Sequence, residues 1–201
     1  MEEWRGRKVL IVGAARQGIA LAGYLSRHGA RVVLNDRRPL EDLAAARQAL
    51  AAYPDIRWAA GGHPPDLLEG IDLVCVSGGV PLSLPLLVEA RRLGIPLSND
   101  SQIFLEAAPC PVVGITGSSG KTTTTTLAGR IAQAALQGHP GRAWVGGNIG
   151  SPLIEVVDEM TAADWAVLEL SSFQLELMDR SPQVAAVLNV TPNHLDRHGT
   201  M

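Results

Sequence analysis

The feature that most constrains the fold is a glycine-rich loop that lies between an apolar run and a long helical pattern. Residues 111–115 predict a buried strand, residues 116–120 a loop and residues 121–136 a helix. From residue 116 to residue 122 the chain reads Thr-Gly-Ser-Ser-Gly-Lys-Thr. Glycines let backbone N–H groups turn toward phosphate oxygens, and the first turn of the helix adds unpaired donors and a favourable dipole. The segment therefore predicts a phosphate-binding βα unit.

Lys121 and Thr122 carry the chemical groups that such a loop requires. An ammonium group can reach the β- and γ-phosphates of a nucleotide, and a hydroxyl can ligate Mg²⁺. Lys121 is one of only two lysines among seventeen basic residues, so its presence here is informative. The strict G-x-x-x-x-G-K-[ST] pattern is not met, because Ile115 stands at its first position. The competing interpretation is an ordinary strand-to-helix turn with a surface lysine.

Upstream of this loop, short apolar runs alternate with amphipathic helical stretches. This alternation predicts an α/β domain with a parallel sheet covered by helices on both faces. Ligands of such sheets bind at the carboxyl ends of the strands, where Gly13, Asp36 and Ser77 fall. The predicted strands are residues 8–12, 31–34, 56–60, 72–76 and 95–97, and the predicted helices are residues 17–28, 40–52 and 84–93.

The turn after the first predicted strand runs from Gly13 to Gly18 and resembles the G-x-G-x-x-G loop of Rossmann folds. Ala15 stands where the second glycine belongs, and that glycine normally permits close approach of a pyrophosphate. Asp36 follows about twenty residues later, where a contact to a ribose or a base is expected. The pattern fits a nicotinamide enzyme, a nucleotide-sugar site or a simple tight turn.

The second half of the chain contains three more polar or glycine-rich segments. Glu169 ends a predicted strand, where its carboxylate can ligate Mg²⁺ or pair with an arginine. His194, Asp196 and His198 crowd into five residues; a zinc site is conceivable, but no cysteine completes it, and a polar cap over the cleft is favoured. Residues 146–150, Gly-Gly-Asn-Ile-Gly, predict a loop that a ligand can approach closely. The remaining predicted elements are a short helix at residues 101–107 and strands at residues 165–168 and 184–188.

Composition excludes several classes of protein. Of 201 residues, 46% are hydrophobic and 18% are charged, which is typical of a globular protein with a core. The net charge of −3 argues against a general attraction to nucleic acid. Two unclustered cysteines, Cys75 and Cys110, make neither a disulfide framework nor a metal site. No apolar run approaches the ~18 residues of a membrane span, and the N-terminus does not resemble a leader, so we expect a cytoplasmic protein without membrane insertion.

A break near residues 98–111, which contains Pro109-Cys110-Pro111, separates two α/β units. We expect a Rossmann-like parallel-sheet domain at residues 1–97 and part of a P-loop-type α/β ATPase domain at residues 98–201. The second sheet has few predicted strands and no closing helix, and an open edge is a liability. We therefore interpret the chain as a fragment of a longer protein.

The order of these motifs is similar to that of the Mur ligase family. The similarity extends through essentially all 201 residues, and Ser-Ser-Phe-Gln-Leu-Glu at residues 171–176 points to the members that add D-glutamate. The resemblance implies a UDP-sugar-binding domain and a central ATPase domain, with the family's third domain outside this chain. It implies ligation of D-glutamate to UDP-N-acetylmuramoyl-L-alanine through an acyl phosphate, with ATP and Mg²⁺, in the synthesis of peptidoglycan precursors. The motifs are the turn at residues 13–18, Asp36, Ser77-Gly78-Gly79, Thr-Gly-x-x-Gly-Lys-Thr, Gly-Gly-Asn-Ile-Gly, Leu-Glu-Leu-Ser-Ser-Phe-Gln-Leu-Glu and Asn-x-x-x-x-His-Leu-Asp-Arg-His.

The resemblance also implies roles for individual residues. Catalytic roles fall on Lys121 and His194. Contacts to the UDP-sugar substrate are expected from Gly13, Asp36, Arg37, Ser77, Gly79, Asn148 and His194. The ATP phosphates are expected to lie against Gly117, Ser118, Ser119, Gly120, Lys121, Thr122, Thr123 and Thr124. Metal ligands are expected from Thr122, Glu169 and His194.

The sequence departs from the family pattern at three positions. Gly78 replaces a usual proline, Ser119 replaces a usual asparagine in the phosphate loop, and Asn193 stands where an aspartate is common. A modified lysine that helps to hold a second metal, the adenine pocket and most D-glutamate contacts would fall beyond Met201. We therefore expect the 201-residue chain alone to be inactive.

Three other functions stay open. A nicotinamide-dependent oxidoreductase would leave the loop at residues 116–122 unexplained. Another Mur-type ligase or a folate-glutamate ligase is disfavoured by Phe173-Gln174. A module that binds a nucleotide sugar without catalysis would become the leading interpretation if 201 residues were the whole protein. The sequence does not predict the oligomeric state.

Overall fold

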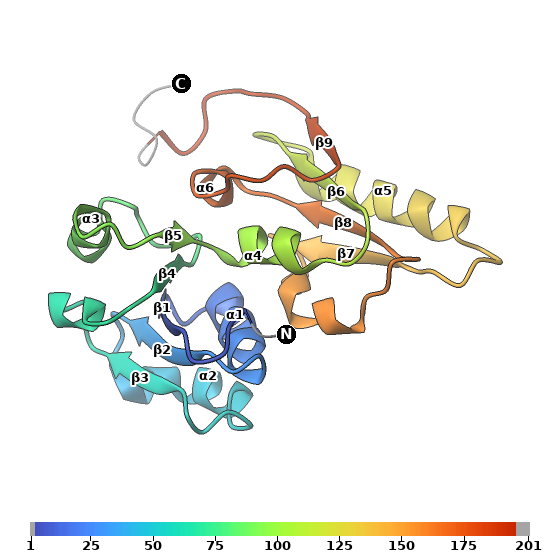
Figure 1. Cartoon of the computed structure of the whole chain (residues 1–201). Coiled ribbons are helices and arrows are strands. Elements are labelled where there is room, and N and C mark those ends of the chain that lie inside the picture. The colour runs from blue at the N-terminus through green and yellow to red at the C-terminus, as the bar shows by residue number, and fades with distance from the viewer. Residues whose placement is uncertain (1–2, 196–201) are drawn as a thin grey trace. The chain divides into compact units, whose positions relative to one another are not determined.

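The computed structural model of the chain describes residues 3–195. The chain divides into two compact units, Met1–Asp100 and Ser101–Met201. Each unit contains one parallel sheet with associated helices, as Figure 1 shows. The α/β fold class expected from the sequence is confirmed.

The first unit is built on a five-stranded sheet in the order β3-β2-β1-β4-β5, and every neighbouring pair of strands is parallel. β1 is the central strand, and its residues 9–12 are at most 1% exposed. A parallel strand with both faces covered requires such a continuous apolar run. The strands are β1 (Lys8–Val12), β2 (Arg31–Asp36), β3 (Arg57–Ala60), β4 (Leu73–Val76) and β5 (Leu97–Ser98).

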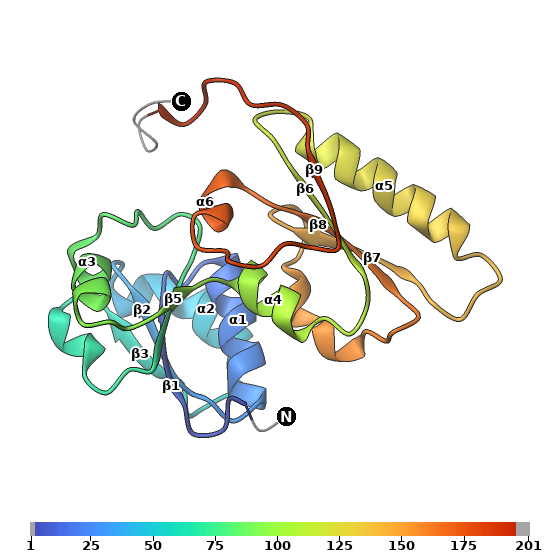
Figure 2. The same cartoon turned by 45° about the horizontal axis from the view of Figure 1, so that its top comes forward.

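Three α-helices accompany these strands: α1 (Arg16–Arg27), α2 (Ala44–Ala49) and α3 (Pro85–Arg92). Right-handed crossovers from β1 to β2 and from β4 to β5 run in opposite directions along the sheet, so α1 and α3 cover opposite faces. Figure 1 and Figure 2 both show α1 and α3 on opposite sides of β1. The chain leaves α1 through Gly29, whose φ of +85° is a left-handed conformation that favours glycine.

One helix is shorter than the sequence predicts. The alanine-rich pattern predicts a single helix over residues 40–52, but a 3-10 helix at Leu40–Leu43 is followed by α2 at Ala44–Ala49. The break falls at Leu43, which is 1% exposed and has φ −100° and ψ 12°, outside the α region. Burial of this leucine therefore outweighs the helix propensity of the surrounding alanines.

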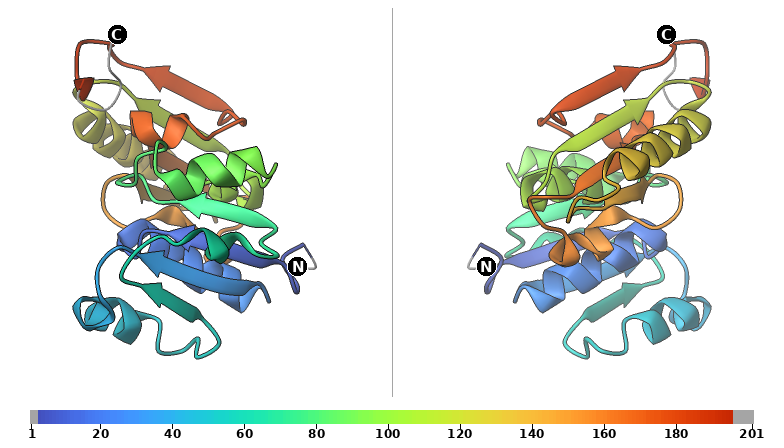
Figure 3. Two further views of the ribbon diagram at one scale, coloured as in Figure 1. Left: turned by 90° about the vertical axis from the view of Figure 1, so that its left-hand side faces the viewer. Right: turned by 90° about the vertical axis from the view of Figure 1, so that its right-hand side faces the viewer.

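The second unit is built on a four-stranded parallel sheet in the order β7-β8-β6-β9. The long helix α5 packs against β7 and β8, so closely that a Cβ at Gly129 would lie 2.3 Å from Val145 Cγ2. Figure 3 shows β9, in red, at the edge beside β6. The elements are α4 (Asp100–Ala107), β6 (Val112–Thr116), α5 (Lys121–Ala135), β7 (Ala143–Gly147), β8 (Trp165–Glu169), α6 (Ser172–Leu175) and β9 (Val184–Val187), with 3-10 helices at Leu153–Glu155 and Val157–Glu159; a further 3-10 helix, Pro65–Leu68, belongs to the first unit.

The prediction of a loop at residues 146–150 is wrong for its first two residues. β7 runs over Ala143–Gly147 and pairs with β8. Glycine has a low strand propensity, so the sequence pattern does not indicate a strand here. The packing nevertheless requires this residue type, because a Cβ at Gly147 would lie 2.6 Å from the carbonyl oxygen of Glu169.

The lengths of the helices are those of a globular α/β protein. α5 has 15 residues. Across residues 3–195, no helix has both the length and the hydropathy needed to cross a membrane.

Candidate functional site

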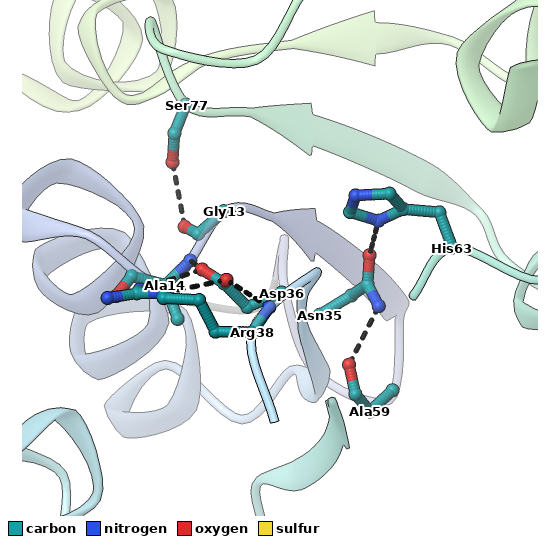
Figure 4. A network of polar contacts seen from close by, with 8 residues as sticks. All are labelled: Gly13, Ala14, Asn35, Asp36, Arg38, Ala59, His63 and Ser77. Carbon is teal, nitrogen blue, oxygen red and sulfur yellow. Dashed lines mark hydrogen bonds and ion pairs between the residues drawn. The ribbon is translucent and has the colours of Figure 1, made fainter. Parts of the chain in front are cut away.

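Gly13 follows β1 at the point where the strand order reverses, between β1 and β4. Its φ of +104° favours glycine, and its N–H donates to Asn35 O at 2.8 Å. Ser77, directly after β4, donates its hydroxyl to the carbonyl oxygen of Gly13 at 2.8 Å (Figure 4). Ligands of open parallel sheets bind at such a reversal. The first unit thus brings two of the predicted substrate residues, Gly13 and Ser77, together at the edge where a ligand is expected.

Glycine is also required where α1 begins against this turn. A Cβ at Gly18 would lie 2.0 Å from the carbonyl oxygen of Gly13 and 3.0 Å from Ser77 Oγ. The close approach of helix and strand is the reason for a glycine at this place in Rossmann-type turns. Gly79, also a predicted substrate contact, differs, since a Cβ there would meet no atom within 4 Å. Packing therefore accounts for Gly18 and not for Gly79.

Asp36 is the central charged group of the first unit. It is 7% exposed, and its carboxylate accepts hydrogen bonds from Ala14 N at 2.8 Å and from Arg38 N at 3.0 Å. The guanidinium of Arg38 adds hydrogen bonds from Nε and from a terminal nitrogen, both at 2.9 Å. The hydrogen bond from Arg38 is the largest cause that holds the pKa of Asp36 well below its ordinary value, and burial opposes it. Asp36 is thus a fixed anion that orients an arginine.

The arginine that contacts Asp36 is the residue after the predicted one. Arg37 is exposed, whereas Arg38 forms the ion pair with Asp36 and also donates to Ala14 O at 3.0 Å. Sequence reasoning missed Arg38. The available signal was local: an aspartate often accepts from the backbone N–H two residues later, and such a turn brings the side chain of Arg38 back toward Asp36.

A cavity of about 810 Å³ lies at the amino ends of β1, β2 and β3, opposite the strand ends that precede Gly13 and Ser77. It is lined by Lys8, Arg31 and Arg57, the first residues of β1, β2 and β3. Because ligands of parallel sheets bind at the carboxyl ends of the strands, we place the site at the edge that bears Gly13 and Asp36.

The predicted phosphate loop joins β6 to α5 in the second unit. Gly117 and Gly120 have φ values of +146° and +82°, conformations that favour glycine. Lys121 folds back over the loop, and its Nζ donates to Gly117 O at 2.6 Å and to Ser118 O at 3.3 Å. Gly120, the N-cap residue of α5, has no side chain that could cap the first turn, and a helix N-terminus of this kind suits an anion.

Asn189, just after β9, holds this loop in shape. Ser119 N donates to Asn189 Oδ1 and Asn189 Nδ2 donates to Ser119 O, both at 3.0 Å. Ser118 N donates to Asn189 O at 3.0 Å, and the hydroxyl of Ser118 donates to Thr191 O at 2.9 Å. Neither Asn189 nor Thr191 is among the site residues expected from the sequence. Their signal was the position of a polar segment directly after an apolar run that predicts a buried strand. The strand itself is confirmed as β9, but its burial is not, since Val184 is 50% and Val187 is 66% exposed.

Glu169 lies at the end of β8, beside the loop, and is 1% exposed. Thr122 donates its hydroxyl to Glu169 Oε2 at 2.9 Å, and Asn148 Nδ2 donates to Glu169 Oε1 at 2.9 Å. A hydroxyl and a carboxylate oxygen are the hard ligands that Mg²⁺ prefers. Two predicted metal ligands, Thr122 and Glu169, are therefore adjacent. Asn148, predicted to contact substrate, is joined to the same carboxylate.

His194 lines the same cavity as Lys121 and Asn148, a space of about 430 Å³ at the carboxyl ends of β6 and β9. Its ring lies 5.0 Å from that of Phe173, and its φ is +51°. Within the described part of the chain, His194 contacts neither Thr122 nor Glu169. Among the same residues, no group of three His, Cys, Asp or Glu side chains suited to a metal is found. Asp196 and His198 lie outside the described residues.

Comparison with known proteins assigns both units to one family. Residues 7–99 match a family model described as the Mur ligase MurD-like N-terminal domain, and residues 115–201 match the Mur ligase middle domain. The chain belongs to the Mur ligase family.

Among curated proteins, it is similar to the UDP-N-acetylmuramoylalanine--D-glutamate ligases of Acidobacterium capsulatum, with 44% identity, and of Anaeromyxobacter dehalogenans, with 46% identity, each over 199 residues. These alignments cover 98% of this chain but 42% and 41% of the relatives, so the chain spans about two fifths of their length.

Solved structures show the same fold at low sequence identity. The UDP-N-acetylmuramate:L-alanyl-gamma-D-glutamyl-meso-diaminopimelate ligase from Neisseria meningitides matches with a TM-score of 0.56 and 20% identity, over 96% of this chain and 63% of that chain. The UDP-N-acetylmuramate-alanine ligase MurC from Thermotoga maritima matches with a TM-score of 0.51 and 22% identity, over 96% of this chain and 44% of that chain. These likenesses support the α/β fold of the chain.

Proposed function

We propose that the chain is the UDP-sugar-binding domain and part of the ATP-binding domain of a ligase that joins D-glutamate to UDP-N-acetylmuramoyl-L-alanine. We assign the UDP-sugar to residues 1–97 and ATP to residues 98–201. The observation that carries the proposal is the loop of residues 116–122 with Lys121, next to the Thr122–Glu169 contact, in a chain that contains a second glycine turn at residues 13–18. Curated relatives with this reaction in their names align with nearly all of the chain. We place the reaction in the cytoplasm.

The first unit would hold the UDP part of the substrate at the reversal between β1 and β4. Ala15, the residue before α1, has no side chain that could cap the helix, and the N-terminus of a helix suits a diphosphate. Arg38 is fixed by Asp36, yet its side chain is 44% exposed. A guanidinium held in this way can contact a ligand with little further loss of rotamer freedom. Arg37, Ser77 and Gly79 stay proposed contacts on the same edge.

The second unit would hold the phosphates of ATP. Lys121 would exchange its contacts to Gly117 O and Ser118 O for the β- and γ-phosphate oxygens. Residues 117–124 would lie against the same oxygens, and the N–H groups of the first turn of α5 would face them, whereas those of Ser118 and Ser119 are donated to Asn189. Thr122 and Glu169 would hold Mg²⁺, which supplies positive charge against the phosphates when it is bound.

The reaction brings two anions together. The carboxylate of the L-alanyl group attacks the γ-phosphorus of ATP, which gives an acyl phosphate and ADP. The amine of D-glutamate then attacks the acyl carbon, and phosphate leaves from the tetrahedral intermediate. Lys121 and the loop N–H groups would stabilise the charge that spreads over the transferring phosphoryl group. Asn148 and His194 line the cavity beside them, and we propose that they meet the reacting end of the substrate.

The alternative functions differ in how much of the chain they use. A nicotinamide-dependent oxidoreductase would use the turn at residues 13–18 and Asp36, but it has no need of Lys121 beside a Thr122–Glu169 pair. A ligase for another amino acid, or a module that binds nucleotide sugar without turnover, uses the same two sites and differs only in the substrate or in the absence of catalysis.

The test is calorimetric titration of the chain with UDP-N-acetylmuramoyl-L-alanine, NAD and Mg-ATP. Binding of the UDP-sugar with no binding of NAD supports the proposal, and Asp36→Ala should then weaken that binding. NAD binding without UDP-sugar binding contradicts it and favours the oxidoreductase. Turnover is measured on the full-length ligase with D-glutamate and with other amino acids, and selectivity for another amino acid would contradict the proposed specificity.

A further inference from the structure

The loop after β3 returns to the carboxyl end of β2, where a fully buried residue holds it. Asn35 is 0% exposed, and its Nδ2 donates to Ala59 O and to Gly62 O at 2.7 Å each. Both carbonyls belong to the end of β3 and the loop after it, which carries His63. This loop is therefore fastened to the strand end that presents Asp36.

The contact to Asn35 determines which ring nitrogen of His63 carries the proton. The two hydrogen bonds donated by Nδ2 fix the orientation of the Asn35 amide, and Oδ1, like any amide oxygen, can only accept. His63 Nδ1 lies 2.5 Å from this oxygen, so Nδ1 carries the proton and Nε2 has the lone pair of the neutral ring. Figure 4 shows Nε2 turned away from Asn35, toward the side on which Gly13 and Ser77 lie. Across residues 3–195, Nε2 has no hydrogen-bond partner.

The surroundings favour the neutral ring. Burial is the largest influence and lowers the pKa of His63 from its ordinary value of 6.5, Asp36 opposes this, and Arg37 lowers the pKa further. The loop also meets the charged segment directly, because Gly61 N donates to Asp36 O at 3.1 Å and to Arg38 O at 2.9 Å. A hydrogen-bond acceptor thus stands beside the groups that suit an anion.

We infer that His63 is a further ligand-binding residue of this site, and that its Nε2 accepts a hydrogen bond from the nucleoside of a bound uridine diphosphate. The inference rests on the proposed function, which supplies the UDP-sugar as ligand. Diphosphate oxygens only accept hydrogen bonds, so the donors of the helix end and of Arg38 recognise phosphate without selecting the nucleoside. Uridine carries donors in its imide N–H and its ribose hydroxyls, and an acceptor at Nε2 adds selectivity for them.

The test uses two variants of the chain and three nucleotides. His63→Asn places an amide near the position of Nδ1, so it can keep the contact to Asn35 Oδ1 while it removes the acceptor at Nε2. His28→Asn is the matched control, because His28 also uses Nδ1, at 2.8 Å from Tyr24 O, at the end of α1. UDP, 2′-deoxy-UDP and N3-methyl-UDP are titrated by calorimetry, and thermal unfolding of each variant reports on the fold.

We expect His63→Asn to unfold like the wild type and to bind UDP roughly 3- to 10-fold more weakly, as for the loss of one hydrogen bond, while His28→Asn binds as the wild type does. One analogue should lack the group that donates to His63 Nε2. That analogue should bind the wild type more weakly than UDP does, and its affinity should not fall further in His63→Asn. Weak binding of N3-methyl-UDP would identify the imide N–H as the donor, and weak binding of 2′-deoxy-UDP would identify the 2′-hydroxyl. Equal UDP affinity of the wild type and His63→Asn would overturn the inference and leave the proposed function intact. No binding of UDP to the wild type would overturn both.

Discussion

Replacing Gly18 by alanine tests whether α1 must begin against the turn at Gly13. In an isolated helix, alanine is about 1 kcal/mol better than glycine. At position 18, however, the added Cβ would lie 2.0 Å from the carbonyl oxygen of Gly13 and 3.0 Å from Ser77 Oγ. Ordinary van der Waals contacts begin at 3.4 Å, which is 1.4 Å longer than the distance to the Gly13 oxygen, so either the helix or the carbonyl has to move.

The expected change in the free energy of unfolding follows from two opposing effects, the steric overlap and the helix propensity of alanine. Overpacking of this kind costs about 1–3 kcal/mol, and the helix propensity of alanine offsets part of it. We expect Gly18→Ala to lower the free energy of unfolding by about 1–2 kcal/mol, which for a unit of this size corresponds to a fall in Tm of roughly 5–15 °C. The hydrogen bond from Ser77 to Gly13 O, 2.8 Å long, should weaken with it, and so should binding of the UDP-sugar.

Gly23→Ala is a matched control on the same helix. A Cβ at Gly23 would lie 3.5 Å from Tyr53 and 3.7 Å from Leu50, which are ordinary van der Waals contacts. This variant should therefore be as stable as the wild type or more stable by up to about 1 kcal/mol. Urea and thermal unfolding of both variants decide the matter. If Gly18→Ala gains stability as Gly23→Ala does, the argument that the turn requires glycine is refuted.

Three further predictions concern charge and loop shape. In the full-length ligase, Lys121→Ala should lower turnover by roughly 100-fold or more with a much smaller change in UDP-sugar affinity, and near-normal turnover would remove Lys121 from the proposed machinery. The Arg38 hydrogen bond depresses the pKa of Asp36 in the folded state, so this group adds stability that is fully present above the ordinary pKa of 3.8 and is lost as the pH falls through the lower folded pKa; Asp36→Asn should flatten the decline of stability in urea unfolding below pH 4, and an unchanged slope would argue against the ion pair. Asn189→Ala removes the two 3.0 Å hydrogen bonds to Ser119 and should weaken Mg-ATP binding by roughly 10-fold, as measured by titration; unchanged affinity would show that the loop keeps its shape without them.

The sequence predicts those parts of the molecule that depend on local chemistry. The strand at residues 8–12 is an apolar run bounded by polar and glycine residues, and the structure has β1 over the same residues. The phosphate loop is predictable for the same reason. Gly117 and Gly120 have positive φ values, and glycine is the residue type that adopts such values most readily. The contact between Thr122 and Glu169, 47 positions apart, follows from the general rule that ligands gather at the carboxyl ends of parallel strands.

What the sequence does not predict depends on pairings between distant segments. β7 includes two glycines and becomes a strand only because β8 lies alongside it. The threonine run at residues 122–126 has poor helix propensity, yet it lies within α5, where Thr125 is 0% exposed. His63 meets Asn35 across 28 positions, and nothing in either local sequence indicates the partner. In each case tertiary packing overrides the local preference.

The contact between the phosphate loop and Asn189 affects when the loop can adopt its folded shape during synthesis of the chain. Ser119 and Asn189 are 70 positions apart, so at a synthesis rate of about 5–20 residues per second the loop exists for several seconds before its partner has been made. Bringing Ser119 and Asn189 together also costs conformational entropy, because the segment between them has to close into a loop. During that interval the nascent chain contains Gly120, Lys121 and Thr122 in full, yet the backbone around them has no support from β9. The most recognisable motif of the sequence is therefore among the last parts of its unit to reach working shape.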